Sequence, residues 1–175
     1  MRKWMPATLP GLIAGLWGSQ AGAAGLDVKF EIPRLNVAEY HRPYVAVWLE
    51  RPDQSVATNL AVWYQQSDGA EGKGTKWLAE LRQWWRKSGR ESQLPIDGVS
   101  GATKPAGEHA LSFTEGKAPL AKLPAGDYRL VVEAAREVGG RELLRVPFTW
   151  PPKSAQTLKA EGKEELGAIS LQLKP

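Results

Sequence analysis

The sequence predicts an all-β protein: an immunoglobulin-like antiparallel β-sandwich of about seven strands, with one tryptophan-rich amphipathic helix packed on its outside. Three observations predict this fold class. Apolar and polar residues alternate in short segments over most of the chain, glycines and prolines separate these segments, and a single segment has helical periodicity instead.

The N-terminus has the pattern of a secretory signal peptide. Arg2 and Lys3 precede an apolar run from Met5 to Trp17, and the small residues at 21–24 suit a signal peptidase. The apolar run is shorter than the roughly 18 residues that a membrane span requires, and no second run follows. We therefore expect residues 1–24 to be removed, and the mature protein to be periplasmic without a transmembrane anchor.

Six segments alternate with a period of two residues, which is typical of half-buried strands. Gly139 and Gly140 separate two of them, and a glycine pair between alternating apolar residues predicts a hairpin. Because about 150 residues suffice for one domain with a core, we expect 25–175 to form a single β-sandwich domain. The expected strands are Leu26–Ile32, Val45–Leu49, Leu60–Tyr64, Tyr128–Ala134, Leu144–Trp150 and Leu166–Leu173.

The segment from about residue 75 to residue 88 breaks this rhythm. Its apolar residues recur at spacings of three, four and seven, which places them on one face of a helix. Thr75 is a suitable N-cap and Gly89 a suitable stop, and basic residues make up the rest of the surface. The apolar face consists of Trp77, Leu78, Leu81, Trp84 and Trp85.

Strand parity predicts where this helix lies, because side chains alternate between the two faces of a strand. If the apolar residues at 45, 47 and 49 face the core, Trp48 faces outward. If Leu60 and Val62 face the core, Trp63 faces outward as well. Two outward tryptophans would leave a large exposed apolar patch, so we expect the helix to cover both.

Composition excludes several classes of function. Cysteine is absent, which rules out disulfides, thiolate catalysis, thioether-linked haem and a lipoprotein anchor. The 23 basic and 19 acidic residues give a net charge of +4, without a basic stripe that would indicate nucleic-acid binding. His41 and His109 have no metal-ligand spacing, and no hydrolase motif is present, so we expect no metal site and no catalytic residues.

The segment 89–107 is rich in Gly, Pro and Ser, lacks periodicity and is predicted to be a long loop. Structureless loops of more than about 12 to 15 residues are uncommon in compact domains and are often functional. This one contains Asp97-Gly98-Val99-Ser100-Gly101-Ala102-Thr103. The pattern Asp-x-x-Ser-Gly-Ala-Thr resembles the acceptor motif on which exported bacterial flavoproteins carry FMN as a phosphoester to the final threonine.

The motif resemblance implies a covalent FMN on Thr103. Small neighbouring side chains would give a flavin transferase access to the Thr103 hydroxyl. Asp97 would either shape the loop through a backbone amide or position the acceptor hydroxyl, or its metal ion, in the transferase. The attached phosphodiester would carry one negative charge, which the lysine that follows the motif would partly offset. The cofactor-binding residues implied are Asp97, Ser100, Gly101, Ala102 and Thr103.

A second resemblance rests on five blocks: Arg42–Trp48, Leu60–Tyr64, Trp77–Trp84, Asp97–Gly107 and Pro124–Tyr128. Together they resemble the bacterial family of predicted periplasmic proteins called domain of unknown function 2271. Such proteins look like partners of flavin transferases and of membrane reductases with peptidase-propeptide-like domains. The resemblance implies an exported accessory protein of a flavin-linked redox system. This protein either carries FMN on Thr103 and passes electrons or acts as an accessory partner, and it is not an enzyme.

An alternative of a different class stays open. The segment Lys104–His109, followed by Phe113, Gly116 and the turn at Pro124–Tyr128, resembles the immunoglobulin-like domains of flagellar hook-capping proteins. In those domains the same residues shape a strand and a turn. On this alternative Thr103 is an ordinary residue entering a strand. The protein is then a cofactor-free module that binds proteins or cell-envelope components through a sheet edge.

Overall fold

The computed structural model describes residues 23–67 and 73–175. The expected signal peptide at 1–24 therefore lies almost wholly outside the described residues and stays a prediction. Within them the chain forms nine strands, one α-helix and two 3-10 helices. The strands are β1 Gly25–Ile32, β2 Tyr44–Glu50, β3 Val56–Tyr64, β4 Ser100–Ala102, β5 Gly107–Thr114, β6 Gly126–Ala135, β7 Arg141–Trp150, β8 Gln156–Glu161 and β9 Ala168–Lys174; the helices are η1 Gly74–Glu80, α1 Arg82–Lys87 and η2 Gly89–Glu91.

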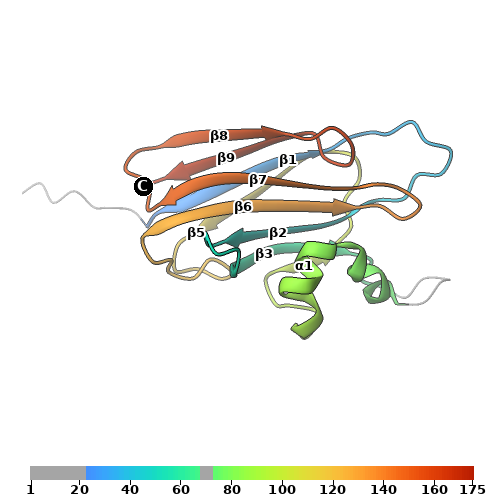
Figure 1. The fold of residues 1–175 in the computed structure, drawn as a ribbon, viewed down its shortest axis with the longest axis horizontal. Helices are drawn as coiled ribbons and strands as arrows, with labels where there is room; N and C mark the ends of the chain where they lie inside the picture. The colour runs from blue at the N-terminus through green and yellow to red at the C-terminus, as the bar shows by residue number, and fades with distance from the viewer. Residues whose placement is uncertain (1–22, 68–72) are drawn as a thin grey trace, which may run out of the picture.

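Two sheets pack face to face into a sandwich (Figure 1). One sheet has the strand order β5-β1-β9-β8 and the other the order β4-β3-β2-β6-β7. The pairs are antiparallel except β3 with β4, which is parallel. The predicted all-β sandwich is confirmed. All six expected strands occur, although the last begins at Ala168 and not at Leu166, and β4, β5 and β8 are additional.

The arrangement of the central strands is that of an immunoglobulin-like sandwich. β1 pairs with β5 in one sheet, and β2 pairs with β6 in the other. The chain therefore crosses from one sheet to the other between β1 and β2 and again between β5 and β6. Near the start of β6 the Tyr128 hydroxyl donates a hydrogen bond to the Pro124 carbonyl at 2.8 Å. This contact is the tyrosine corner, which fixes the turn into the corresponding strand of immunoglobulin-like domains.

The main core lies between the two sheets and consists of apolar side chains from both. Removing a large apolar side chain from water contributes roughly 1.5–3 kcal/mol to folding, so this layer supplies most of the driving force. Among the largest fully buried side chains in it are Trp150, Phe30, Leu26, Ile32, Leu49, Leu60, Leu120 and Leu130.

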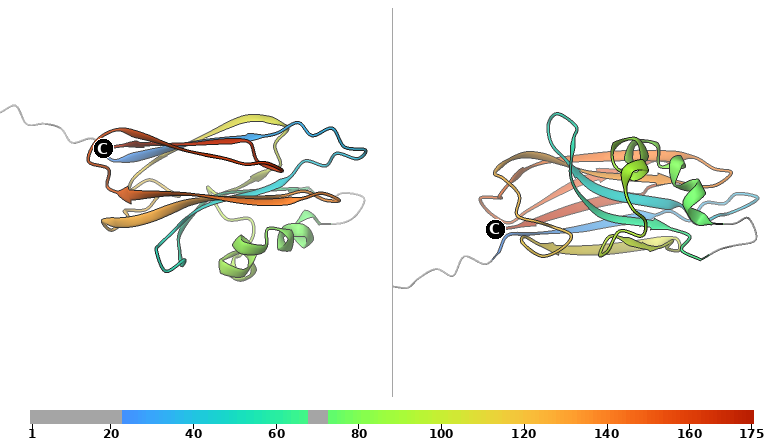
Figure 2. Two further views of the ribbon diagram at one scale, coloured as in Figure 1. Left: turned by 45° about the horizontal axis from the view of Figure 1, so that its top comes forward. Right: turned by 90° about the horizontal axis from the view of Figure 1, so that it is seen from below.

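A second core lies on the outer face of the five-stranded sheet, where η1 and α1 cover it (Figure 2). Trp48 from β2 and Val62 from β3 pack there with Trp84 of α1, and all three are fully buried. Trp84 also donates from its indole Nε1 to the Asn59 side chain at 3.0 Å. The prediction that the tryptophan-rich segment covers this face is confirmed. No helix in the described ranges is long and apolar enough to cross a membrane.

The predicted outward orientation of Trp63 is wrong. Val47 pairs with Ala61, whereas Trp48 pairs with Asn59, so Leu60 is an extra residue in β3. This β-bulge reverses the alternation of β3 beyond it, because two consecutive residues then face the same side. Trp63 consequently points into the main core, with its ring centroid 5.2 Å from that of Phe30.

The helix expected at 75–88 is divided into η1 and α1 at Leu81. The buried carboxylate of Glu133 on β6 accepts the backbone N–H groups of Gln83 at 3.0 Å and Trp84 at 2.8 Å. A negative charge at a helix N-terminus satisfies free N–H groups and interacts favourably with the helix dipole, so Glu133 sets the start of α1. Thr75 is not an N-cap, because η1 already begins at Gly74.

The predicted loop at 89–107 is not structureless. It contains η2, and it contributes β4, which extends the five-stranded sheet. Ser100 pairs with Val62, Gly101 with Trp63 and Ala102 with Tyr64. A three-residue strand is too short to show periodicity, which is why the sequence does not predict it.

Candidate functional site

A closed turn precedes β4 and carries the first part of the Asp97–Thr103 segment. The Ser100 side-chain oxygen accepts the Ile96 N–H at 2.9 Å, and the Ser100 N–H donates to the Ile96 carbonyl at 2.9 Å. Gly98 has a φ of 66°, a conformation that glycine adopts without steric cost. Asp97 is exposed and has no hydrogen-bond partner in the described part of the chain. Ser100, not Asp97, therefore shapes this turn.

Gly101 lies directly against the Trp63 indole. A Cβ atom at position 101 would stand 3.1 Å from Trp63 Cδ1 and 3.4 Å from Nε1, tighter than an ordinary contact. Gln66 Nε2 donates to the Gly101 carbonyl at 3.3 Å, and Lys104 Nζ lies 5.6 Å from the centre of the Trp63 ring. The absence of a side chain at 101 thus lets β4 pack on Trp63.

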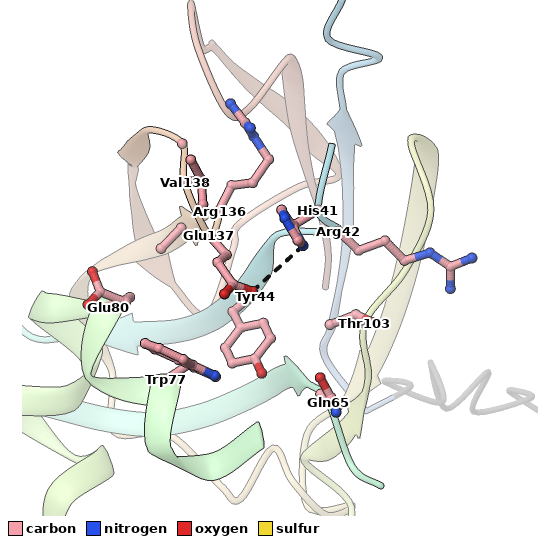
Figure 3. Close-up of a pocket in the computed structure, with 12 residues that line it drawn as sticks. His41, Arg42, Tyr44, Gln65, Trp77, Glu80, Thr103, Arg136, Glu137 and Val138 are labelled. Atoms are coloured by element: carbon pink, nitrogen blue, oxygen red, sulfur yellow. Dashed lines mark ion pairs between the residues drawn. The ribbon is translucent and has the colours of Figure 1, made fainter. Parts of the chain in front are cut away.

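Thr103 follows β4 and lies on the wall of a pocket of about 420 Å³. The pocket collects side chains from the segment before β2, the end of β3, η1 and the β6–β7 hairpin, which are far apart in the sequence (Figure 3). Figure 3 shows Tyr44 between Trp77 and Thr103 in that view. The lining residues include His41, Arg42, Tyr44, Gln65, Trp77, Glu80, Thr103, Arg136, Glu137 and Val138.

Tyr44 and Trp77 form the aromatic part of this pocket. The Tyr44 hydroxyl donates to the Gly74 carbonyl at 3.1 Å, and its ring meets Tyr64 edge-on at 6.5 Å. Burial raises the pKa of Tyr44, and the nearby charge of Glu137 raises it further, so the phenol stays protonated at neutral pH. Trp77 is partly exposed, which leaves part of its ring available to a ligand.

Charged groups surround the pocket, and most of them are paired. His41 lies 2.8 Å from Glu39 and 3.6 Å from Glu137, and the second of these contacts is drawn in Figure 3. Arg136 makes a bidentate pair with buried Glu165, with both distances 3.0 Å. Arg42 is exposed and forms no ion pair with residues in the described ranges. Arg42 is therefore the guanidinium at this pocket that can meet an anion.

Val138 lies at the tip of the β6–β7 hairpin, at the rim of the pocket. The turn closes through the Gly139 N–H, which donates to the Arg136 carbonyl at 3.0 Å, so the predicted hairpin is confirmed. Val138 has a φ of 51° and is 79% exposed. A β-branched residue in this left-handed region is a backbone outlier, and such outliers cluster at ligand sites.

The profile of a family described as "Predicted periplasmic protein (DUF2271)" matches residues 25–168. The chain belongs to the DUF2271 family. A search of curated proteins finds no match, and a search of solved structures finds none either. The family description agrees with the predicted periplasmic location, and the matched range contains the whole of the pocket.

For this DUF2271 protein the structure brings only part of the sequence-derived site together. Of the five motif residues, Thr103 alone lines the pocket. Ser100 and Gly101 hold β4 in place, Ala102 is an exposed β4 residue paired with Tyr64, and Asp97 is an exposed residue of the preceding turn.

Sequence reasoning did not single out Tyr44 or Arg42 as site residues, and it placed Trp77 on the apolar face of the helix, with the tryptophans as a group left as packing residues or as a platform for a cofactor or glycan. One signal could have found Tyr44, because it has the same strand parity as Ala46 and Trp48. It therefore had to lie on the helix-covered face of the sheet. Arg42 precedes β2 and follows no periodic pattern, so only the folded chain places it at the pocket.

Proposed function

We propose that this protein is an exported accessory protein of a flavin-linked redox system and that it carries FMN covalently on Thr103. The observation that supports the proposal most strongly is the position of Thr103. It is the acceptor residue of the motif and the one motif residue that opens onto a pocket with aromatic walls. The motif is a pattern in the sequence and the pocket is a feature of the fold, yet the two share this residue.

The residues around Thr103 fit the chemistry of FMN. A volume of about 420 Å³ lies within the range of about 300–1,000 Å³ that small-molecule sites occupy. Tyr44 and Trp77 offer rings against which a planar ring system would pack. Arg42 on the pocket wall and Lys104 beside Thr103 would balance the phosphodiester charge. These residues would hold the group, which supplies reversible electron transfer when it is bound.

The attachment step uses the Thr103 hydroxyl as the nucleophile. Its oxygen forms a bond to the phosphorus on the riboflavin side of FAD, and the bond from that phosphorus to the bridging oxygen breaks. AMP leaves with the bridging oxygen, the hydroxyl proton passes to a base of the transferase, and no electrons are transferred. Residues 103–106 belong to no strand, and Thr103 is partly exposed, so a transferase could reach this hydroxyl.

The partners implied are a flavin transferase and a membrane reductase. The transferase would load Thr103 once, and the reductase would then exchange electrons with the loaded protein. The protein itself would turn over no substrate, so its residues would position the cofactor and exclude water from one side of it.

Intact mass tests the attachment. The mature protein is produced in a bacterial periplasm together with a flavin transferase, and its mass should rise by that of FMN less water. Thr103→Val should abolish the increase. The matched control Thr157→Val, at an exposed position of β8, should retain it. An unchanged mass beside a flavinylated control protein would contradict the proposal.

A cofactor-free immunoglobulin-like module is the second candidate, and a specific observation favours it. Ser100 and Gly101 have structural roles in β4 that need no cofactor, namely the turn with Ile96 and the contact with Trp63. Such a module would bind a partner strand at the exposed margin of a sheet, as in other strand-addition complexes. The same mass measurement separates the two candidates, because this one predicts no increase with any competent transferase.

A further inference from the structure

Positive charge is concentrated in one short stretch of the chain. Residues 73–91 contain six basic and two acidic residues, a net charge of +4, which equals the formal net charge of the whole chain. The other 156 residues therefore contain 17 basic and 17 acidic residues and sum to zero. A strong local asymmetry of this kind marks a surface that attracts anions.

The fold turns most of this charge outward. Leu78, Leu81 and Trp84 are fully buried against the five-stranded sheet, so the opposite side of η1 and α1 faces solvent. These helices form the layer outside that sheet (Figure 2). We call the exposed basic residues of this side the cationic surface; they are Lys73, Lys76, Arg82, Arg86 and Arg90.

Lys87, the sixth basic residue of this stretch, is less exposed and is bound within the fold, whereas exposed Arg90 lies 3.8 Å from its neighbour Glu91. Lys87 Nζ lies 2.6 Å from the buried Glu50 carboxylate and donates to the Gln54 carbonyl at 2.8 Å, so it ties α1 to the β2–β3 hairpin. Arg82 and Arg86 form no ion pair within residues 23–67 and 73–175, and Arg86 Nε donates to the Arg82 carbonyl of the same helix at 3.3 Å. Like charges four residues apart on a helix are destabilising, and a positive charge in the first turn opposes the helix dipole, so the stability of α1 does not explain Arg82.

Two tryptophans lie within the cationic surface. Trp77 and Trp85 are partly exposed, while Trp84 is fully buried. Lys76 Nζ stands 4.6 Å from the centre of the Trp77 ring. Basic residues would suit any anion, but half-exposed tryptophan combined with Lys and Arg is typical of surfaces that sit at lipid headgroups.

We propose that the cationic surface, with Trp77 and Trp85, binds anionic phospholipid headgroups at a periplasmic membrane face. The DUF2271 family is described as periplasmic, so the protein lies between two membranes. Trp77 and Glu80 also line the pocket that contains Thr103, and docking through this surface would bring the pocket close to the membrane. The binding itself does not depend on the flavin proposal, because no residue of the cationic surface is needed to attach a cofactor.

Vesicle sedimentation of the mature, unmodified protein tests the inference. The probes are vesicles of phosphatidylglycerol mixed with phosphatidylcholine in equal parts, and vesicles of phosphatidylcholine alone. Each basic residue near an anionic surface contributes on the order of a fivefold gain in affinity, so Arg82→Gln/Arg86→Gln should weaken binding about 25-fold. The control Lys153→Gln/Lys159→Gln removes the same charge on the side of β8 and should leave binding unchanged.

The expected result is binding to the anionic vesicles only, which is lost as salt is raised and is about 25-fold weaker in the Arg82/Arg86 variant at low salt. Circular dichroism and an unchanged urea midpoint verify that this variant is folded. Absence of sedimentation with phosphatidylglycerol at low salt would overturn the proposal, and an acidic protein would then be the partner to seek. Equal loss of binding in the β8 control would overturn it as well, because the attraction would then be general.

Discussion

The Cα atom of Gly101 lies against the Trp63 indole, closely enough that a Cβ atom there would stand 3.1 Å from Trp63 Cδ1. This contact joins the motif to the main core, because Trp63 packs on Phe30 inside the sandwich. It gives Gly101 a structural reason to be glycine. Thr103, two residues further along the chain, lines the pocket, so the segment both packs on the core and lines the site.

Gly101→Val should lower the free energy of unfolding by about 1–3 kcal/mol, because the added side chain overpacks the Trp63 contact. Urea unfolding followed by tryptophan fluorescence measures it. Ala102→Val is the matched control, since residue 102 is exposed in the same strand and should change stability by less than about 0.5 kcal/mol. Equal stability of the two variants would show that the indole does not confine position 101.

Glu133→Gln should destabilise the protein by about 2–4 kcal/mol. The buried carboxylate accepts the Gln83 and Trp84 N–H groups and pairs with Arg141 at 2.6 Å, and the amide cannot replace these charged contacts. Thermal unfolding measures the loss. Glu108→Gln removes an exposed partner of Lys29 and should have an effect below about 1 kcal/mol. A small effect of Glu133→Gln would contradict its role in fixing α1.

Val138→Gly should raise stability by about 1 kcal/mol, because glycine accepts the φ of 51° without the steric cost that valine meets. Val138→Ala should bring no such gain, since alanine retains a Cβ atom. Chemical unfolding of the three proteins compares them directly. If glycine and alanine behaved alike, strain at this turn would not be the cause.

The stabilisation that the Glu142 carboxylate contributes should be lost in acid. Burial alone would raise its pKa, but the backbone N–H groups of 163–166 donate to its carboxylate and lower the pKa below the usual 4.5. A lowered pKa in the folded state means that this stabilisation is present above pH 4.5 and is lost as pH falls through the folded pKa.

The stability difference between the native protein and Glu142→Gln should therefore be largest near neutral pH and shrink below about pH 4.5. Urea unfolding at a series of pH values measures it. A difference that stayed constant down to pH 2 would contradict the assigned contacts.

Alternation and helical spacing suffice to predict the sandwich, six of its strands and the covering of the Trp48 face, because each depends on local periodicity. The orientation of Trp63 is the prediction that local periodicity gets wrong. A bulge at Leu60 reverses its orientation, and a bulge depends on the pairing with β2 and not on the sequence of β3 alone. The break at Leu81 likewise depends on Glu133, about fifty residues away in the sequence.

The candidate site is predictable only in part for the same reason. Thr103 is visible in the sequence because the motif is contiguous. Tyr44, Trp77 and Arg42 meet it only after β2, η1 and β4 have assembled around β3, so no spacing along the chain indicates them. A motif thus identified one residue of the pocket, and the fold supplied the others.

The central claim is that Thr103 carries FMN, and its most direct test is site localisation by mass spectrometry. After coexpression with a flavin transferase, trypsin should release the peptide 91–117, which contains Ser100, Thr103 and other hydroxyl residues. Fragment ions should place the added mass of FMN less water on Thr103. An unmodified peptide, or a modification on any other hydroxyl, would contradict the claim.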